Sequence, residues 1–113
     1  MNEGQALTAL SALAEPTRLA ILRWLVRQGL AGAAAGEIAV AAGASPSRAS
    51  FHLAVLERAG LVTSTRAARR MIYTVDLTVM GGLLAFLLAD CCADDPTVRA
   101  CCASASGSDR PDT

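Results

Sequence analysis

Apolar residues recur every three or four positions along much of the chain, a spacing that places them on one face of an α-helix. Residues 7–13 predict a short amphipathic helix that ends near Glu15, because the residue before a proline disfavours the helical conformation. Pro16 suits the first turn of a second helix, which we expect to stop at Gly29. The expected apolar positions are Leu7, Leu10 and Leu13 in the first helix and Leu19, Ile21, Leu22, Leu25 and Val26 in the second.

A short turn separates the next two predicted helices. The stretch EIAVAAG predicts a helix that ends at Gly43, and Ser45 and Pro46 are favoured as the N-cap and first residue of another. Apolar residues then repeat at helical spacing up to Gly60. Two helices joined by a tight turn at residues 43–45 have the spacing of a helix-turn-helix.

The remaining pattern predicts a β-hairpin and one more helix. The runs LVTSTR and RMIYTV are β-prone and are joined by AAR, which gathers arginines at the tip of the hairpin. Asp76 is expected to cap a final helix that is apolar all round and must therefore be covered all round. We expect one face of this helix to pack on the domain and the opposite face on a second copy of the chain. After Cys102 the composition is typical of a loose tail.

Length and composition favour one small, helix-rich domain in the cytoplasm. The chain has 113 residues, enough for one core, and a homodimer would bury more apolar surface. The N-terminus lacks the pattern of a signal peptide, and the apolar run at residues 79–89 is shorter than the roughly 20 residues that cross a bilayer. We therefore expect no membrane association and a reducing compartment in which thiols stay free.

The charges are divided between the two parts of the chain. Residues 1–75 carry eight arginines and four glutamates, and residues 76–113 carry two arginines and six aspartates. Arginine can bind phosphate or guanine through two hydrogen bonds, but it is equally common as a solvated surface charge. The basic part is thus compatible with nucleic-acid binding without establishing it.

Three strings in the chain match the motifs of a known family: ALAEPTRLAILRWL, SPSRASFHLAVLERAGLV and RMIYTVD. Together they resemble the ArsR/SmtB family of winged-helix, metal-responsive bacterial repressors, over about residues 7–88. The resemblance implies an α+β, mostly helical winged helix-turn-helix protein, not an enzyme, that dimerises through its N- and C-terminal helices. It implies operator DNA as the partner, with the helix at residues 45–59 in the major groove. We expect this domain to span residues 1–92 and a flexible cysteine-containing tail to span residues 93–113.

The start of the second helix of the helix-turn-helix is the expected DNA-reading surface. In such dimers the first residues of this helix reach base edges, and the two helices lie about 34 Å apart to match one turn of the duplex. Arg48 is the best candidate for a contact with guanine, and Phe51 for a contact with a thymine methyl group. Arginines of the hairpin would contact phosphates or the minor groove, the alternative being an ordinary charged turn. The expected DNA-binding residues are Ser47, Arg48, Ser50, Phe51, Arg66, Arg69 and Arg70.

Three positions differ from the usual pattern or need separate interpretation. Pro46 and Phe51 stand where the family usually carries polar groups, so that base readout would be thinner. The hairpin tip lacks the glycine commonly found there, which leaves its length and twist open. His52 is interpreted as a structural hydrogen-bonding residue, because it is the only histidine and is far from the cysteines in the sequence.

All four cysteines lie in two adjacent pairs near the C-terminus. The other sensor sites of the family are absent, because the last helix lacks histidines and EIAVAAG lacks cysteines. Some arsenic-responsive members of the family carry such a pair with a third cysteine further on, and trivalent arsenic prefers three sulfur ligands. Pro96 favours a break in the helix that lets the chain return. The candidate ligands are Cys91, Cys92, Cys101 and Cys102, with the first two and one of the others, Cys101 slightly preferred, acting together.

The expected inducer is As(III), with Sb(III) or methylarsenite as related inducers and no organic cofactor. Arsenous acid is uncharged and condenses with thiols by losing water, whereas Cd²⁺, Pb²⁺ or Zn²⁺ require thiolates, which the neighbouring aspartates disfavour. A repressor that responds to those divalent metals, or to thiol oxidation, remains an alternative. Disulfides within the pairs or idle cysteines are a further alternative, and a thiol enzyme is disfavoured because no acid or base accompanies the cysteines.

Overall fold

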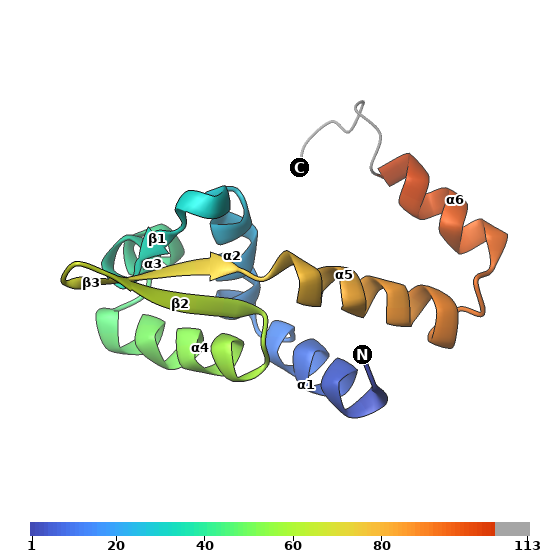
Figure 1. The fold of residues 1–113 in the computed structure, drawn as a ribbon, viewed down its shortest axis with the longest axis horizontal. Coiled ribbons are helices and arrows are strands. Elements are labelled where there is room, and N and C mark those ends of the chain that lie inside the picture. Colours follow the sequence, from blue (N-terminus) through green and yellow to red (C-terminus); the bar gives the residue numbers. More distant parts are fainter. Residues whose placement is uncertain (106–113) are drawn as a thin grey trace.

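Helices make up most of the chain, and they are joined by a small three-stranded sheet whose first strand lies between α2 and α3. The computed structural model describes residues 1–105. Its elements are α1 (Glu3–Leu13), α2 (Pro16–Val26), the short 3₁₀ helix η1 (Gly29–Ala31), β1 (Ala33–Ala34), α3 (Ala35–Ala42), α4 (Pro46–Arg58), β2 (Val62–Ala67), β3 (Arg70–Val75), α5 (Leu77–Phe86), the π-helical η2 (Leu87–Cys91) and α6 (Pro96–Ala105). Figure 1 shows the hairpin of β2 and β3 at one end of the molecule and α6 at the other. The predicted winged helix-turn-helix architecture is confirmed.

At the helix starts, side chains accept hydrogen bonds from the backbone N–H groups that have no partner within the helix. Asn2 and Gln5 form a capping box at α1, with both hydrogen bonds 2.8 Å long. The Ser45 hydroxyl accepts from the Arg48 amide at 3.2 Å, as predicted, and Pro46 is the first residue of α4. Asp76 caps α5 by accepting from the amides of residues 78 and 79. Each of these helices therefore starts at a position specified by local sequence.

The three-stranded antiparallel sheet has the order β1-β3-β2. Gly32 precedes β1 with φ of 62°, and a Cβ at this position would lie 2.4 Å from the Tyr73 carbonyl oxygen of β3. Only glycine fits this close approach, which lets Ala33 pair with Tyr73. In the turn of the helix-turn-helix, Gly43 ends α3 in the left-handed conformation, with φ of 65°.

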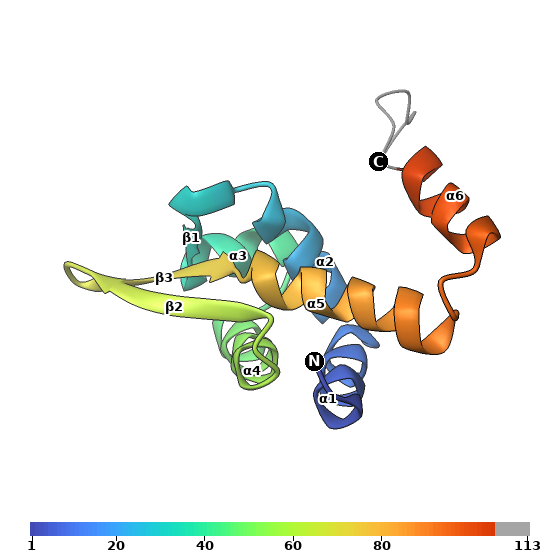
Figure 2. The same ribbon diagram turned by 45° about the vertical axis from the view of Figure 1, so that its right-hand side comes forward.

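A two-residue turn, Ala68-Arg69, joins β2 to β3. Such turns need a positive φ at their first central residue, a conformation that glycine adopts most easily. Ala68 takes this place with φ of 59°, and the connection is one residue shorter than the expected AAR. Figure 2 shows the resulting hairpin, the wing, extending beyond the helices.

The core lies between the helices α1–α5 and the base of the wing. Its fully buried large residues are Ile21, Leu25, Ile38, Leu53, Leu56, Leu61 and Val62. The expected apolar faces of the first two helices are wrong in part. In α1 the buried residues are Ala6, Ala9 and Ala12, whereas Leu7 is 59% exposed and Leu10 39%. In α2 Leu19 and Val26 are exposed. Small alanines let α1 pack closely on its neighbours, and this turns its leucines outward.

The helical C-terminal segment differs from the expected tail. α5 continues into η2, and the chain then turns through Ala93 and Asp94, both with positive φ (51° and 54°). The predicted helix break before Pro96 is confirmed, but residues 96–105 form α6 where the sequence indicated flexible chain. Asp95 accepts from the Thr97 amide at 2.8 Å and favours this helix start. The rest of the expected loose tail, residues 106–113, lies outside the described residues.

Candidate DNA interface and cysteine pairs

The first two turns of α4 present a polar surface on the side opposite the core. Ala49 and Leu53 anchor the helix in the core, and the side chains on the outer side are exposed. These exposed residues are Ser47, Arg48, Ser50 and Phe51, the four predicted DNA contacts of this helix. The Arg48 guanidinium reaches back to the Thr17 hydroxyl at 3.4 Å, and Phe51 is 60% exposed. The structure thus brings these four predicted residues together on one surface.

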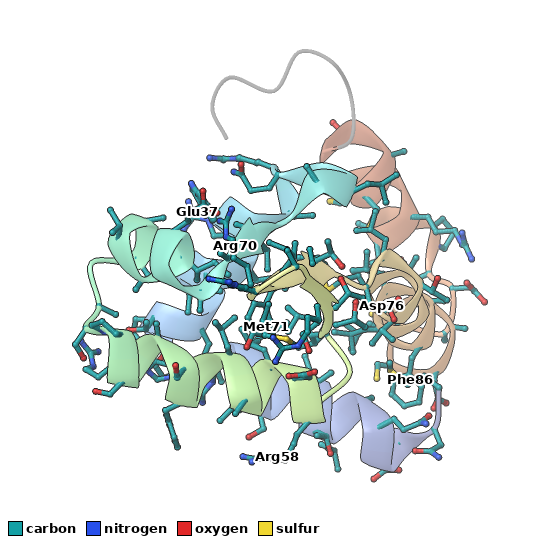
Figure 3. All side chains as sticks on the ribbon, turned by 60° about the vertical axis from the view of Figure 1, so that its left-hand side comes forward. Glu37, Arg58, Arg70, Met71, Asp76 and Phe86 are labelled. Carbon is teal, nitrogen blue, oxygen red and sulfur yellow. The ribbon has the colours of Figure 1, made fainter. Side chains whose placement is uncertain are left out.

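The wing divides its three predicted arginines into two groups. Arg66 and Arg69 are exposed, and within residues 1–105 neither guanidinium has a hydrogen-bond or ion-pair partner. Arg70 instead donates to the Glu37 carboxylate of α3 at 3.1 Å, as the side chains labelled in Figure 3 show. Glu37 also accepts from the Ala34 amide at 2.8 Å. Arg66 and Arg69 are therefore available to an external anion, whereas Arg70, at the start of β3 beside the turn, is engaged by Glu37 of α3.

Arg18 makes contacts that the sequence pattern does not predict. Its Nε donates to the Ala12 carbonyl oxygen at 2.6 Å, and its Nη1 lies 3.1 Å from Nδ1 of His52. His52 is only 7% exposed, and its predicted structural hydrogen bond is confirmed. The sequence feature that could have indicated this role is the position of Arg18 after Glu15-Pro16, at the corner between α1 and α2.

Glu15 completes this corner. Its Oε1 accepts from the Arg18 amide at 2.9 Å, which caps α2. This backbone hydrogen bond lowers the pKa of Glu15 below its ordinary value, while partial burial opposes the shift. The same oxygen lies 3.9 Å from His52 Nδ1. The carboxylate is thus favoured in its charged form at the start of α2.

The cysteine pairs lie on two consecutive helical segments. Cys91 ends η2 and is exposed, Cys92 follows it and is half-buried, and Cys101 and Cys102 are exposed on α6. All four are free thiols. Within residues 1–105 no three cysteine, histidine, aspartate or glutamate side chains come close enough together to hold a metal ion. The predicted three-sulfur site therefore requires a rearrangement of this segment.

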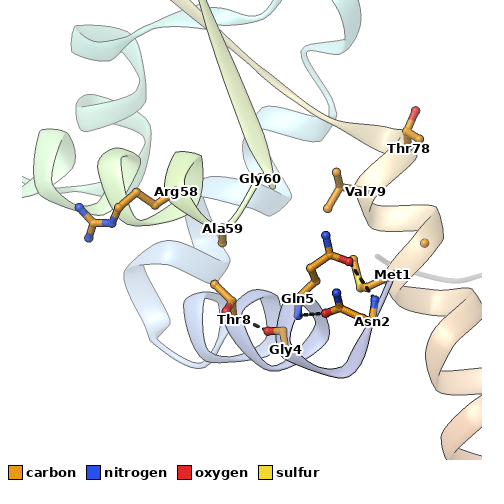
Figure 4. A pocket seen from close by; sticks show the side chains of 11 residues that line it. Met1, Asn2, Gly4, Gln5, Thr8, Arg58, Ala59, Gly60, Thr78 and Val79 are labelled. Carbon is orange, nitrogen blue, oxygen red and sulfur yellow. Dashed lines mark hydrogen bonds between the residues drawn. The ribbon is translucent and has the colours of Figure 1, made fainter.

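A groove of about 880 Å³ lies between α1, the end of α4 and the start of α5. Its lining includes Gln5, Thr8, Arg58, Val79 and Gly82 (Figure 4). The exposed Leu7 and Leu10 of α1, and Leu84 of α5, lie on the same pair of helices. These two helices leave apolar surface uncovered in the single chain. In the described part of the chain, no helix is both long and apolar enough to span a bilayer.

A helix-turn-helix with a β-hairpin wing and exposed arginines on both defines a winged-helix DNA-binding protein. A family model described as a helix-turn-helix domain matches residues 13–65. The HTH-type transcriptional regulator YgaV of Escherichia coli K12 is 37% identical over 83 residues, covering 74% of this chain and 82% of YgaV. A protein of Streptomyces lividans named a probable mercury resistance operon repressor is 34% identical over 97 residues, covering 85% of this chain and 74% of that protein.

A solved structure agrees with these relatives. The homodimeric winged helix-turn-helix DNA-binding domain Mb0332 of Mycobacterium bovis, described as a possible ArsR-family regulator, is 34% identical. It superposes with a TM-score of 0.63, covering 77% of this chain and 80% of that domain. The chain belongs to the ArsR family of winged helix-turn-helix transcriptional regulators.

Proposed function

We propose that the chain is a homodimeric transcriptional repressor that leaves its operator when a soft, thiol-binding metalloid closes the C-terminal cysteines into one site. The preferred inducer is trivalent arsenic, with antimony next. The observation that carries this proposal is the placement of two free cysteine pairs on either side of the turn at residues 93–95. Transcription of the regulated genes would then rise when the metalloid is present.

Operator recognition uses the exposed residues of α4 and the wing. Arg48 pairs with a guanine in the major groove, Ser47 and Ser50 contact neighbouring polar groups, and Phe51 meets a thymine methyl group. Arg66 and Arg69 bind phosphate or the minor groove, since both are exposed and unengaged within residues 1–105. Arg70 contacts DNA only by exchanging its ion pair with Glu37.

The homodimer is formed by α1 and α5. Leu7, Leu10 and Leu84 are exposed on these helices, and a second copy would cover them. The similar domain from Mycobacterium bovis is homodimeric, which supports this assignment. A dimer also places two copies of α4 against successive turns of one duplex.

Arsenous acid fits the thiols because it needs no prior charge on them. Each thiol proton leaves with one arsenic-bound hydroxyl as water, so that three As–S bonds replace three As–O bonds without a change of oxidation state. The ligands are Cys91, Cys92 and one of Cys101 and Cys102. Three sulfurs satisfy a soft trivalent centre that has little affinity for the surrounding carboxylates.

Closure of this site disturbs α6. Cys101 is the sixth residue of α6, so its Cα lies about 7.5 Å along the helix axis from that of Pro96. Sulfurs bound to one centre lie only about 4 Å apart, as for thiolates about 2.3 Å from zinc. We therefore expect the turn at residues 93–95 to reorient and the first turns of α6 to unwind so that Cys101 joins Cys91 and Cys92. The closed site pulls on the end of η2 and, through α5, on the dimer interface, which changes the spacing of the two α4 helices.

A mercury-responsive repressor is the second candidate, favoured by the Streptomyces lividans relative. Mercuric ion is also soft and thiol-binding. It needs only two sulfurs, which Cys91 and Cys92 could supply without α6. The two candidates therefore differ in their need for Cys101 and Cys102.

Release of DNA by a panel of inducers on cysteine variants tests the proposal. The operator is first selected by the wild-type protein from a randomised duplex pool, and release by As(III), methylarsenite, Sb(III), Hg²⁺, Cd²⁺ and Zn²⁺ is measured by fluorescence anisotropy. We expect As(III) to release the wild-type protein from the operator. The Cys91→Ser/Cys92→Ser variant should bind the operator normally and stay bound when As(III) is added. Ser104→Ala, also on α6, is the matched control and should respond as the wild type does.

Several outcomes would contradict parts of this proposal. A variant with all four cysteines replaced that still releases DNA with As(III) would exclude the site. A response to Hg²⁺ alone that survives loss of Cys101 and Cys102 would select the mercury function, and release by peroxide in metal-free buffer would select a thiol-oxidation switch. Far-UV circular dichroism provides a second readout, because As(III) binding should reduce the helical signal as α6 unwinds.

A further inference from the structure

Arg18 joins three helices through one guanidinium. It stands in the first turn of α2, donates from Nε to the Ala12 carbonyl oxygen at the end of α1, and lies with Nη1 3.1 Å from His52 Nδ1 in α4. The carbonyl of Ala12 is one of the last in its helix, which have no partner within the helix. The same side chain therefore completes α1 and contacts the buried face of α4.

The direction of the contact with His52 follows from the chemistry of the two groups. A guanidinium only donates hydrogen bonds, so His52 Nδ1 must accept, and the ring proton of the neutral imidazole is then on Nε2. The ring is nearly buried, with 7% exposure, among the residues that anchor α4. Loss of the Arg18 guanidinium leaves the nearly buried Nδ1 of His52 without its hydrogen bond, which proteins strongly avoid.

The contact is placed next to the DNA-reading surface. His52 follows Phe51 directly and is one turn after Arg48. Arg48 itself contacts the Thr17 hydroxyl, so the corner between α1 and α2 touches the first two turns of α4 at two points. The corner is thus connected to the part of α4 that is expected to enter the major groove.

We infer that Arg18 and His52 are positioning residues for operator recognition, which fix the orientation of α4 relative to α1, the helix that carries the exposed Leu7 and Leu10. With the contact broken, α4 can tilt against the dimer helix, and the two recognition helices no longer match the half-site spacing of one duplex. Base contacts need this match, whereas phosphate contacts on any duplex need it much less. The inference rests on the DNA-binding part of the proposed function and is independent of the inducer.

Four substitutions separate positioning from charge and from stability. His52→Leu removes the acceptor, and His52→Asn restores one near the place of Nδ1. Arg18→Lys keeps the positive charge but loses the planar fork that donates in two directions. Arg23→Lys on the same helix is the matched control, because Arg23 is exposed and has no polar partner within residues 1–105.

The measurement compares two duplexes of equal length, one selected by the wild-type protein from a randomised pool and one of random sequence. We expect His52→Leu and Arg18→Lys to lose about tenfold or more in affinity for the selected duplex, the size of one lost base contact, with little change for the random duplex. His52→Asn and Arg23→Lys should stay close to the wild type on both. Sedimentation and circular dichroism confirm that each variant is a folded dimer at the temperature of the assay.

Arg18→Lys carries the test if His52→Leu fails to fold. If a folded Arg18→Lys or His52→Leu dimer binds the selected duplex with the affinity of the wild type, the positioning inference is overturned and the DNA-binding proposal stands. A parallel loss on both duplexes would overturn it too, since that indicates a general structural role. A wild-type protein that selects no duplex would overturn the DNA-binding proposal and this inference together.

Discussion

The DNA-binding domain and the C-terminal segment are built on different physical principles. Up to Leu83 all five helices α1–α5 and the sheet contribute to one core, and Leu83 is the last buried residue of the described chain. From Leu84 to Ser104 every side chain is exposed or half-buried. Polar contacts in the domain join distant positions, as Arg18 does with His52, whereas those of α6 join near neighbours, such as Asp95 with the Thr97 amide.

This difference teaches where the molecule can change shape. A segment without buried side chains opens at low free energy, while a segment in a continuous core opens only with the whole domain. The cysteines lie in the first kind of segment and the DNA-reading residues in the second. A thiol ligand can therefore rebuild its own surroundings and leave the DNA-reading surface folded.

Truncation of a buried leucine should destabilise the domain, whereas truncation of an exposed leucine of α5 should not. Leu56→Ala empties a fully buried position and should lower the free energy of unfolding by about 2–5 kcal/mol at every protein concentration. Leu84→Ala, at a 55% exposed position, should instead weaken the dimer and make the unfolding midpoint more dependent on concentration. Urea denaturation at several protein concentrations checks both. Equal losses in the free energy of unfolding that do not depend on protein concentration would contradict the comparison.

Removal of one capping side chain in each region should give unequal results. Ser45→Ala removes the cap of α4 and should cost about 1 kcal/mol of global stability. Asp95→Ala removes the corresponding acceptor of α6 and should reduce the helical signal without moving the global unfolding transition. Circular dichroism followed through thermal unfolding measures both quantities. A shift of the main transition by Asp95→Ala would show that α6 belongs to the cooperative unit.

Local chemistry allowed much of this fold to be predicted. Ser45, Pro46 and Asp76 mark helix starts whose hydrogen bonds involve only neighbours in the sequence, and the structure confirms each start. The helix-turn-helix and the hairpin were predicted for the same reason. The outward leucines of α1 were assigned wrongly, because helical spacing shows that a face is apolar but not which surface covers it.

Contacts between distant positions were beyond this kind of reasoning. The contact of Arg18 with His52 depends on how two helices cross, and no local pattern encodes that crossing. The four cysteines were found by their pairing in the sequence, but the separation caused by α6 depends on helix formation after Pro96. Composition favoured a tail there, although the Asp95 cap and the run of alanines and cysteines permit a helix.

Relief of backbone strain should again distinguish the two regions. Ala68 and Ala93 both adopt a positive φ, which is unfavourable for a residue with a Cβ. Ala68→Gly should stabilise the domain by about 0.5–1 kcal/mol, because relief of the strain exceeds the added freedom of the unfolded chain. Ala93→Gly should leave the global transition unchanged, since its segment is outside the core. Chemical denaturation compares the two, and an equal gain from both would contradict the division of the chain.

The smallest expected effect concerns a single charge at the corner that supports α4. Glu15→Gln keeps an oxygen that can accept from the Arg18 amide and removes only the negative charge. Because this hydrogen bond holds the pKa of Glu15 below its ordinary value, the charge stabilises the folded protein above that ordinary value. The contribution disappears as the pH falls through the pKa of the folded state. The melting temperature of Glu15→Gln should therefore lie below that of the wild type at pH 7, and the two should converge toward pH 3. Glu3→Gln, an exposed glutamate in the first turn of α1, controls for the change in net charge, and a difference for Glu15→Gln that is constant with pH would mean that its charge has no part in capping α2.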